Sequence, residues 1–433
     1  MEVFIPLQYI YTMKIAVWHN LVFGGGARAL QYHLQGLITN GHTIEIWSPD
    51  PLISGHIKLH AEVRIHKIRL ERSAHTSYKD RIKSVLFYKD ENIKAMERHC
   101  RQCADEINQG NFDVLFANSC YYYAAPFICR FVQIPSVLYL GEPYRFFFEA
   151  HPRSIWEPPL SLINETKFDK NFYWEWLKDI WKTTNARVRL HEERINIEAA
   201  GKLLLNSWYS AESCARAYDK PGEVCYLGVD TSIFKPVSTR KIENYIISVG
   251  ALYFHKNPEL AIRSIALIQH NRPKLVWVAN LIDDEFCEKI KNLAQSLDVD
   301  FEIKKMICDA ELVQLLSNAL CMVYTAKLEP FGFAPLEANA CQTPVIGLRQ
   351  GGVKEIVNDG ETGFLCSPNA LEISEKIKYF MDNPAERDRM GKSAFENVLH
   401  KWTLHAATRR IEEALFTSIQ RPSSLPANVE LSS

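Results

Sequence analysis

The chain has 433 residues and a mass of 49.8 kDa, which is too long for one compact core and is typical of two domains. Its 50 Lys and Arg residues balance 51 Asp and Glu residues, so the formal charge is −1 at pH 7. This balance argues against a protein that coats DNA or RNA, so we expect no nucleic-acid partner. No uncharged apolar stretch reaches the roughly 18–20 residues of a membrane span, and we expect a soluble protein.

The first twelve residues are apolar and aromatic, but they lack the basic start and the long apolar run of a signal peptide. A typical opening strand follows Met13 at once, so we expect the fold to begin there and leave open whether translation starts at Met1 or Met13. Without a secretion signal, the eleven cysteines are expected to be free thiols in the cytoplasm. His99, Cys100 and Cys103 resemble half a metal site, but no second CxxC completes it, so we expect no metal.

Short β-rich runs alternate with amphipathic helical stretches, which is typical of parallel α/β domains. In the first half of the chain the expected strands are residues 14–19, 43–48, 63–68, 113–117, 136–140 and 202–206. In the second half they are residues 245–249, 274–279, 300–304, 321–325 and 344–347. Two doubly wound, Rossmann-like domains fit this pattern better than one large sheet. Such sheets bind ligands at the carboxyl ends of their strands, so we expect a site in a central cleft between the domains.

A turn-rich run at residues 228–236 marks the expected domain boundary. We therefore predict a first domain over residues 13–228 and a second domain over residues 229–402. Residues 421–433 are rich in Ser and show no periodicity, so we expect a disordered tail.

One segment, residues 151–201, is mostly helical and carries Trp156, Trp174, Trp176 and Trp181. Its aromatic side could pack on the first domain. It could instead contact an acceptor or a membrane interface, because Trp prefers sites with one apolar and one wet side. Residues 51–101 add twelve Lys and Arg against six Asp and Glu, an excess that suits an anionic lipid or acceptor but also an ordinary solvated surface. Peripheral contact of the first domain with the inner face of a membrane is therefore one hypothesis.

The most informative run begins where the strand at residues 321–325 ends. A short loop leads into a helix that Pro335 can open, and Gly332 lets backbone approach a ligand closely. The first N–H groups of such a helix, together with its dipole, form an anion site suited to a diphosphate. Glu329 in the loop and Glu337 in the helix have seven residues between them, and the apolar company of Phe331 argues against a surface pair. One carboxylate can meet a sugar hydroxyl and the other a ribose.

This E-x7-E run resembles the signature of retaining glycosyltransferases of the GT-B fold, in particular glycosyltransferase family 4 (glycosyl transferases group 1). Three other stretches resemble the same family: the strand and loop at residues 248–258, the crossing within residues 206–236 and the glycine-rich segment at residues 350–365. The resemblance covers roughly residues 13–402 and is most specific in the second half.

The resemblance implies a sugar donor with a nucleotide diphosphate in the second domain and a saccharide or lipid-linked saccharide acceptor in the first. It implies transfer with retention of configuration, without cofactor or metal, in the synthesis of polysaccharide (exopolysaccharide above all), lipopolysaccharide or glycolipid. It also implies that a helix at residues 403–420 packs back on the first domain.

Residue roles follow from the matching positions. The resemblance assigns catalysis to Lys256, which would neutralise the departing diphosphate, and to Glu329, which would bind sugar hydroxyls. Gly332 and Phe333 would offer N–H groups to the phosphates, and Glu337 would accept from the ribose. The full expected donor-binding set is Gly25, Gly26, Gly250, Lys256, Glu329, Phe331, Gly332, Phe333 and Glu337.

The chain departs from the family pattern at two positions. Ala251 follows Gly250 where the family usually has an Arg, so Arg28 or Arg145 is a candidate replacement cation. Gly141 stands where many relatives have a His, but in a retaining mechanism the leaving phosphate can itself take the acceptor proton. The acceptor-side candidates are His19, Glu142 and Arg145.

Two other functions fit part of the sequence. The two departures allow a non-catalytic module that binds a sugar nucleotide and has lost the chemistry. Gly24-x-Gly26-x-x-Ala29, followed by Glu45 and Asp50, also fits the dinucleotide fingerprint of a nicotinamide-dependent oxidoreductase. A fingerprint glycine should follow the strand directly, but in this chain Gly24 is the fifth residue after His19, and the oxidoreductase interpretation leaves the E-x7-E run unexplained.

Overall fold

The computed structural model describes residues 12–21, 24–49, 57, 59, 63–71, 91–149, 154–164 and 170–420. The described residues divide into two compact units. Unit 1 takes them from Met1–Leu205, Ala211–Cys225 and Thr408–Ser433, and unit 2 from Asn206–Ser210 and Tyr226–Ala407. The domain boundary at residue 228 and the choice between Met1 and Met13 as the start stay predictions. The expected tail, Met1, Asp50 and most of the basic stretch lie outside the described residues.

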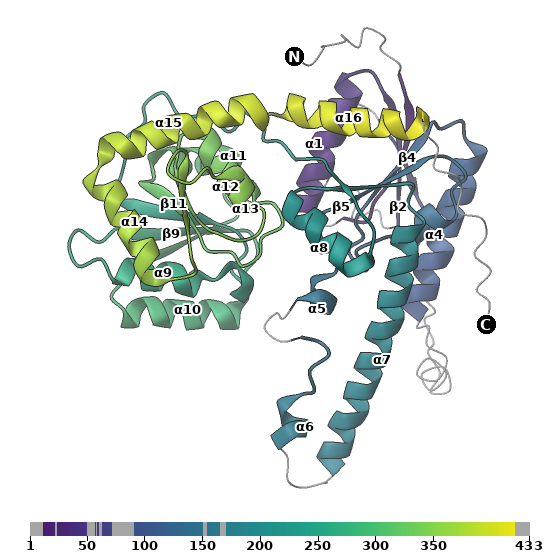
Figure 1. The fold of residues 1–433 in the computed structure, drawn as a ribbon, viewed down its shortest axis with the longest axis horizontal. Coiled ribbons are helices and arrows are strands. Elements are labelled where there is room, and N and C mark those ends of the chain that lie inside the picture. Colours follow the sequence, from purple (N-terminus) through teal and green to yellow (C-terminus); the bar gives the residue numbers. More distant parts are fainter. Residues whose placement is uncertain are drawn as a thin grey trace. The chain divides into compact units, whose positions relative to one another are not determined.

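Unit 1 is built on a parallel sheet with the strand order β3-β2-β1-β4-β5-β6-β7 (Figure 1). The central strand β1 pairs with β2 and β4, so that Ile15 lies opposite both Ile44 and Val114. The strands are β1 (Lys14–Trp18), β2 (Thr43–Ser48), β3 (Arg64–Lys67), β4 (Val114–Asn118), β5 (Ser136–Leu140), β6 (Lys202–Leu205) and β7 (Glu223–Val224). The six strands expected here are all present with ends within one residue, and only the two-residue strand β7 was missed.

Helices connect the strands of unit 1 and enclose a core that includes Trp18, Trp47 and Phe116. They are α1 (Gly25–Thr39), α4 (Glu91–Gln109), η1 (Phe127–Arg130), α5 (Arg145–Phe148), α6 (Leu160–Asn164), α7 (Lys170–Glu198), α8 (Trp208–Tyr218) and α16 (Leu404–Gln420). The helix α8 begins in unit 2, and the helix α16 also starts there. Glu412 of α16 accepts hydrogen bonds from Asn40 and pairs with His42, so the C-terminal helix lies against unit 1.

Unit 2 has a second parallel sheet with the order β10-β9-β8-β11-β12-β13. Its strands are β8 (Tyr245–Val249), β9 (Lys274–Ala279), β10 (Phe301–Lys305), β11 (Cys321–Tyr324), β12 (Val345–Leu348) and β13 (Gly363–Cys366). The five expected strands are present, with ends within one residue of the expected ones. The strand β13, which lies in the glycine-rich segment, was not predicted. The helices are η2 (Phe254–Lys256), α9 (Pro258–Ala266), α10 (Asp284–Ser296), α11 (Asp309–Asn318), α12 (Phe333–Ala340), α13 (Val353–Ile356), α14 (Ala370–Asp382) and α15 (Pro384–Lys401).

All eleven cysteines lie within the described residues and are free; Cys308 is exposed and the other ten are buried. His99 accepts a hydrogen bond from the indole of Trp18 and lies 3.4 Å from the Cys103 sulfur, so these residues belong to the core of unit 1. Within the described ranges no group of three or more potential ligands is placed to hold a metal ion. Among the helices described, none combines the length and the apolar character needed to cross a bilayer.

One buried histidine makes the stability of unit 1 depend on pH. His33, on α1, packs against the rings of Tyr139 and Phe116, with centroids 5.1 and 6.1 Å away. Neither ring nitrogen has a hydrogen-bond partner among the described residues. Burial lowers the pKa of His33 to about 4, so the folded state holds a neutral ring.

We predict that His33→Leu makes unit 1 less sensitive to acid. Between pH 6.5 and 4 the unfolded chain binds a proton at His33 that the folded chain does not, so stability is lost as pH falls through this range. Lowering the pH from 7 to 5 should reduce the free energy of unfolding of wild type by roughly 2 kcal/mol more than that of the variant. Urea unfolding at pH 7 and at pH 5 measures the difference. The control is His270→Leu, which changes an exposed histidine. An equal loss in wild type and His33→Leu would contradict the prediction.

Candidate functional site

The loop between β11 and α12 turns at Gly332, the residue that precedes the helix. Gly332 has φ 111°, a left-handed conformation that favours glycine. The sequence suggested that Pro335 opens the helix. The helix in fact starts at Phe333, so Pro335 is its third residue. The first N–H groups of a helix have no acceptor inside it, and Pro335 contributes none. The start of α12 therefore has the positive electrostatic character that suits an anion.

The structure brings the two expected catalytic residues together. The Lys256 ammonium lies 2.6 Å from a carboxylate oxygen of Glu329, and each side chain is 17% exposed. The Tyr324 hydroxyl lies 3.5 Å from the same ammonium. Burial lowers the pKa of Lys256, but attraction to Glu329 and Tyr324 outweighs it and leaves the pKa above its ordinary value. Lys256 is therefore a fixed positive charge.

Gly250 provides the surface along which Lys256 lies. A Cβ atom at Gly250 would stand 3.5 Å from Cε and 3.6 Å from Cδ of Lys256, and its φ of 153° disfavours other residues. The indole of Trp277 donates to the Gly250 carbonyl at 2.9 Å and fixes this turn. Ala251 follows, so the turn does not carry the second cation that the family usually has there.

Hydrogen bonds tie the η2 segment to the loop that carries Glu329. The Thr325 hydroxyl donates to the carbonyls of Lys256 and Asn257 at 3.0 and 2.9 Å. The Lys327 N–H donates to the His255 carbonyl at 2.9 Å. These contacts hold the two segments in register, which explains how the short distance between Lys256 and Glu329 is maintained.

The glycine-rich segment lies directly against the Glu329 loop. A Cβ atom at Gly351 would stand 2.4 Å from the Glu329 carbonyl oxygen, and one at Gly352 only 2.3 Å from the Pro330 carbonyl oxygen. The Gly352 N–H also donates to the Glu329 carbonyl at 2.7 Å. Residues with side chains cannot make this approach, so the two glycines set the position of the loop.

Glu355 is a residue of this site that sequence reasoning did not single out. Its carboxylate accepts from the N–H groups of Trp208 and Tyr209, both at 2.9 Å, and from the Tyr226 hydroxyl at 2.8 Å. It thus caps the start of α8, where a carboxylate is favourable. In the same part of unit 2 the Ser207 hydroxyl donates to the Pro330 carbonyl at 2.5 Å. The partners lie more than a hundred residues apart in sequence, so no local pattern could reveal them.

Glu337 lies about one turn into α12 and is only 3% exposed. Phe331, which precedes the helix, is buried and packs edge-to-face on Phe333, with ring centroids 5.4 Å apart. The apolar surroundings expected for this run are therefore present. The ribose contact assigned to Glu337 and the phosphate contacts assigned to Gly332 and Phe333 stay predictions.

In unit 1, Gly25 and Gly26 form the first, exposed residues of α1, and Arg28 lies in the same turn. His19 follows β1 and is 1% exposed; burial lowers its pKa to about 4, so its ring is neutral at physiological pH. Its Nδ1 atom accepts from the Leu21 N–H at 3.3 Å. These contacts suit a structural role for His19, and its role toward an acceptor stays a prediction.

The other acceptor-side candidates lie together. The Arg145 guanidinium is 2.7 Å from Glu149 and 3.4 Å from Glu142. Two carboxylates thus offset the one positive charge of Arg145. This arrangement makes Arg145 a weaker candidate for the missing phosphate-binding cation than its sequence position indicated.

Residues 229–397, which lie within unit 2, match the model of the family described as glycosyl transferases group 1. The chain is 28% identical over 233 residues to the mouse alpha-1,3/1,6-mannosyltransferase ALG2, covering 48% of this chain and 56% of that protein. It is 30% identical over 243 residues to a D-inositol 3-phosphate glycosyltransferase of Kribbella flavida, covering 51% and 57%. The chain thus spans a little over half the length of these relatives. The expected resemblance to this family is confirmed in unit 2.

Solved structures resemble the fold as a whole. HepE of Anabaena, crystallised with UDP and glucose, superposes with a TM-score of 0.66 at 14% identity, covering 94% of this chain and 100% of that one. A glycosyltransferase from Rickettsia africae gives a TM-score of 0.67 at 15% identity, with coverage of 95% and 99%. The predicted fold class, two Rossmann-like α/β domains of the GT-B type, is therefore confirmed.

We predict that Gly352→Ala disrupts the site without unfolding the sheet. The new methyl group must displace the Pro330 carbonyl, and with it the Glu329 loop, at a cost of about 1–3 kcal/mol. We expect affinity for the nucleoside diphosphate that wild type binds to fall at least tenfold, as calorimetry can measure. The matched control is Gly360→Ala, where φ is 80° but nothing lies within 4 Å of the new atom. Equal binding by both variants would argue against this role for Gly352.

Proposed function

We propose that the chain is a glycosyltransferase that moves a sugar from a nucleotide-diphosphate sugar to a saccharide or lipid-linked saccharide acceptor. The observation that carries the proposal is the Lys256–Glu329 pair, which lies in the part of the chain that matches the glycosyltransferase model. A permanently charged ammonium and a sugar-binding carboxylate, on a loop that leads into a helix N-terminus, are the groups that such a donor requires.

In this mechanism the charge of Lys256 and the N-terminal end of α12 stabilise the diphosphate as it leaves. This stabilisation matters most in the transition state, where negative charge develops on the leaving oxygen. Glu329 orients the sugar through its hydroxyl groups, and its present bond to Lys256 keeps the ammonium in place. Both positive contributions come from the chain itself, so the proposed reaction needs no metal to neutralise the diphosphate.

We also propose that the reaction retains configuration, as in glycosyltransferase family 4, with the leaving phosphate taking the acceptor proton in the absence of a His at Gly141. Unit 1 would bind the acceptor. The names of the relatives make mannose and inositol phosphate reasonable first compounds to test. The product would belong to a polysaccharide, lipopolysaccharide or glycolipid.

A second candidate function is a non-catalytic module that binds a sugar nucleotide. Ala251 favours it, because a site with one cation fewer stabilises a leaving diphosphate less well. This module would bind the donor in the same place but would not turn it over. Binding and transfer must therefore be measured separately.

The first experiment is calorimetric titration of the full chain with UDP-, GDP-, ADP- and TDP-sugars, without metal and then with Mg²⁺. Saturable binding of one class supports the donor site and identifies the base. Transfer to acceptors is then assayed with that donor. Binding of a donor that is neither transferred nor hydrolysed would favour the non-catalytic module. Absence of binding to every donor would contradict both proposals.

We predict that Glu329→Gln and Lys256→Met each lower the rate of transfer about 100- to 1,000-fold, because each removes a charge that acts on the transition state. Glu329→Gln should affect kcat more than donor affinity, whereas Lys256→Met should weaken both. The matched controls Glu361→Gln and Lys392→Met change exposed residues of unit 2 and should retain wild-type rates. Wild-type transfer by Glu329→Gln would refute the role assigned to Glu329.

A further inference from the structure

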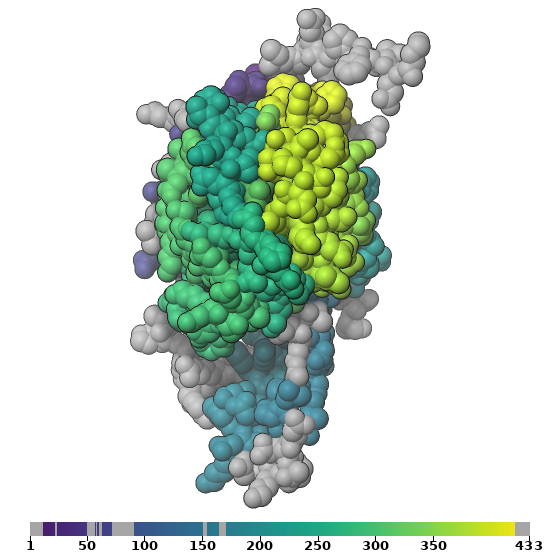
Figure 2. All heavy atoms as spheres, turned by 90° about the vertical axis from the view of Figure 1, so that its left-hand side faces the viewer, coloured from purple at the N-terminus to yellow at the C-terminus, as the bar shows by residue number. Residues whose placement is uncertain are grey.

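The helix α6 and the first half of α7 form an arm that projects from the sheet of unit 1 (Figure 1). The helix α7 has 29 residues, but its buried side chains all belong to its second half, from Ala186 to Ile197. Residues 170–182 contain none, and α6 is the helix that packs beside them. The space-filling view shows the same arm in blue-teal at the lower end of the molecule (Figure 2). The first thirteen residues of α7 therefore contribute little to the core of unit 1.

This arm exposes large apolar side chains. Between 40% and 61% of the surface of each is accessible in the set Tyr173, Trp174, Trp176, Leu177, Ile180 and Trp181. At 100° per residue these six side chains fall within an arc of about 160° on one side of α7. Contiguous apolar surface of this kind on a soluble protein marks a contact with another apolar body.

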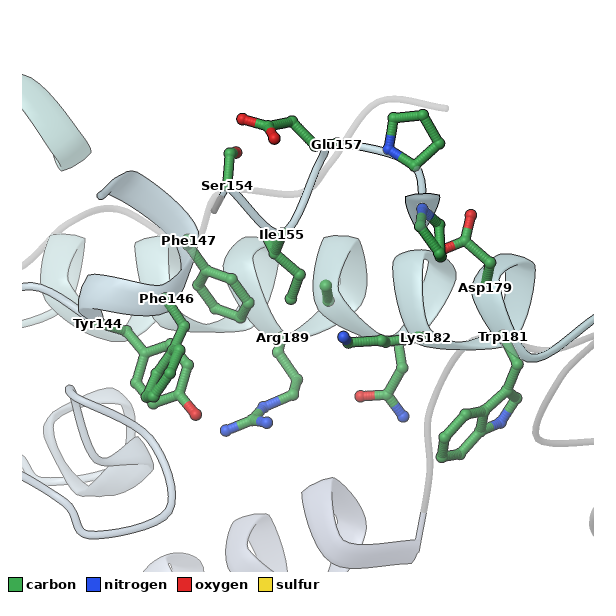
Figure 3. Close-up of a pocket in the computed structure, with 14 residues that line it drawn as sticks. Tyr144, Phe146, Phe147, Ser154, Ile155, Glu157, Asp179, Trp181, Lys182 and Arg189 are labelled. Carbon is green, nitrogen blue, oxygen red and sulfur yellow. The ribbon is translucent and has the colours of Figure 1, made fainter. Parts of the chain in front are cut away.

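Charged residues lie outside this arc: Glu175 and Lys178 form an ion pair, with 44% and 53% of their side chains exposed. Asp179 and Lys182 line a cavity of about 760 Å³ between α7 and residues 154–159 (Figure 3). Trp181 also lines its rim, yet it is 51% exposed. The neighbouring helix α6 adds the exposed Leu160 and Ile163 to the outer surface of the arm.

We infer that this apolar side of α7 docks on the interfacial region of a lipid bilayer. Four of its six side chains are Trp or Tyr, whose rings combine apolar area with a polar group and prefer the headgroup level. A helix that pairs with a second copy of the chain would instead repeat aliphatic residues every three or four positions. An amphipathic helix with an aromatic face and a charged opposite face is the form that lies in a membrane interface.

Charge adds only a little to this contact. Residues 170–182 carry Lys170, Lys178 and Lys182 against Glu175 and Asp179, which gives a net charge of +1. Lys178 lies at the border of the apolar arc, with its ammonium 5.5 Å from the ring of Trp174, and its long stem can reach phosphate groups. Burial of aromatic area should therefore dominate, and anionic lipid should raise the affinity only a few-fold.

The test is co-sedimentation of the full chain with vesicles of phosphatidylcholine, with and without a quarter of phosphatidylglycerol. Leu177→Asp combined with Ile180→Asp places two charges at the centre of the apolar arc, and both positions are exposed, so the fold should persist. We expect partitioning to fall at least tenfold. The control, Leu371→Asp with Leu399→Asp, changes two equally exposed residues of unit 2 and should bind like wild type.

A second measurement on wild type keeps the inference testable whatever the variant does. Brominated phosphatidylcholine should quench tryptophan emission, because Trp174, Trp176 and Trp181 would enter the interface. Absence of binding to both vesicles would overturn the inference. So would a wild-type dimer in sedimentation equilibrium that the double variant converts to monomer. Vesicle binding needs no sugar donor, so its failure would leave the proposed transfer activity untouched.

Discussion

The site in unit 2 depends on a single ion pair that water does not freely reach. Removing both charges of Lys256 and Glu329 from water is costly, and only close, well-aligned contact offsets that cost. Such a pair persists only if its two backbones are held firmly. The Thr325 hydroxyl bonds on one side and the approach of Gly351 and Gly352 on the other supply that restraint. Much of the local architecture can thus be understood as support for one short distance.

Most of the fold could be predicted from the sequence because parallel, doubly covered strands are continuous apolar runs. That pattern is local, and eleven strands were located to within one residue. β7 is too short to show a pattern, and β13 begins at Gly363, where the glycines suggested a loop. The E-x7-E run could also be interpreted from the sequence, since the site that it predicts depends on a local order of strand, loop and helix.

What could not be predicted involves contacts between distant segments. Glu355 caps the start of α8 across 147 residues, and nothing around either residue indicates the other. Arg145 has the right type for a phosphate contact, yet Glu149 one turn away changes what its charge can do. The aromatic run of α7 was recognisable as one side of a helix, but only the position of the rest of unit 1 shows that this side faces outward.

The distribution of thiols has a practical consequence. Cys308, just before α11, is exposed, while ten cysteines are shielded in the two cores, where thiol reagents react slowly. A maleimide dye or spin label would therefore attach to the native chain at one known point of unit 2 without any engineering.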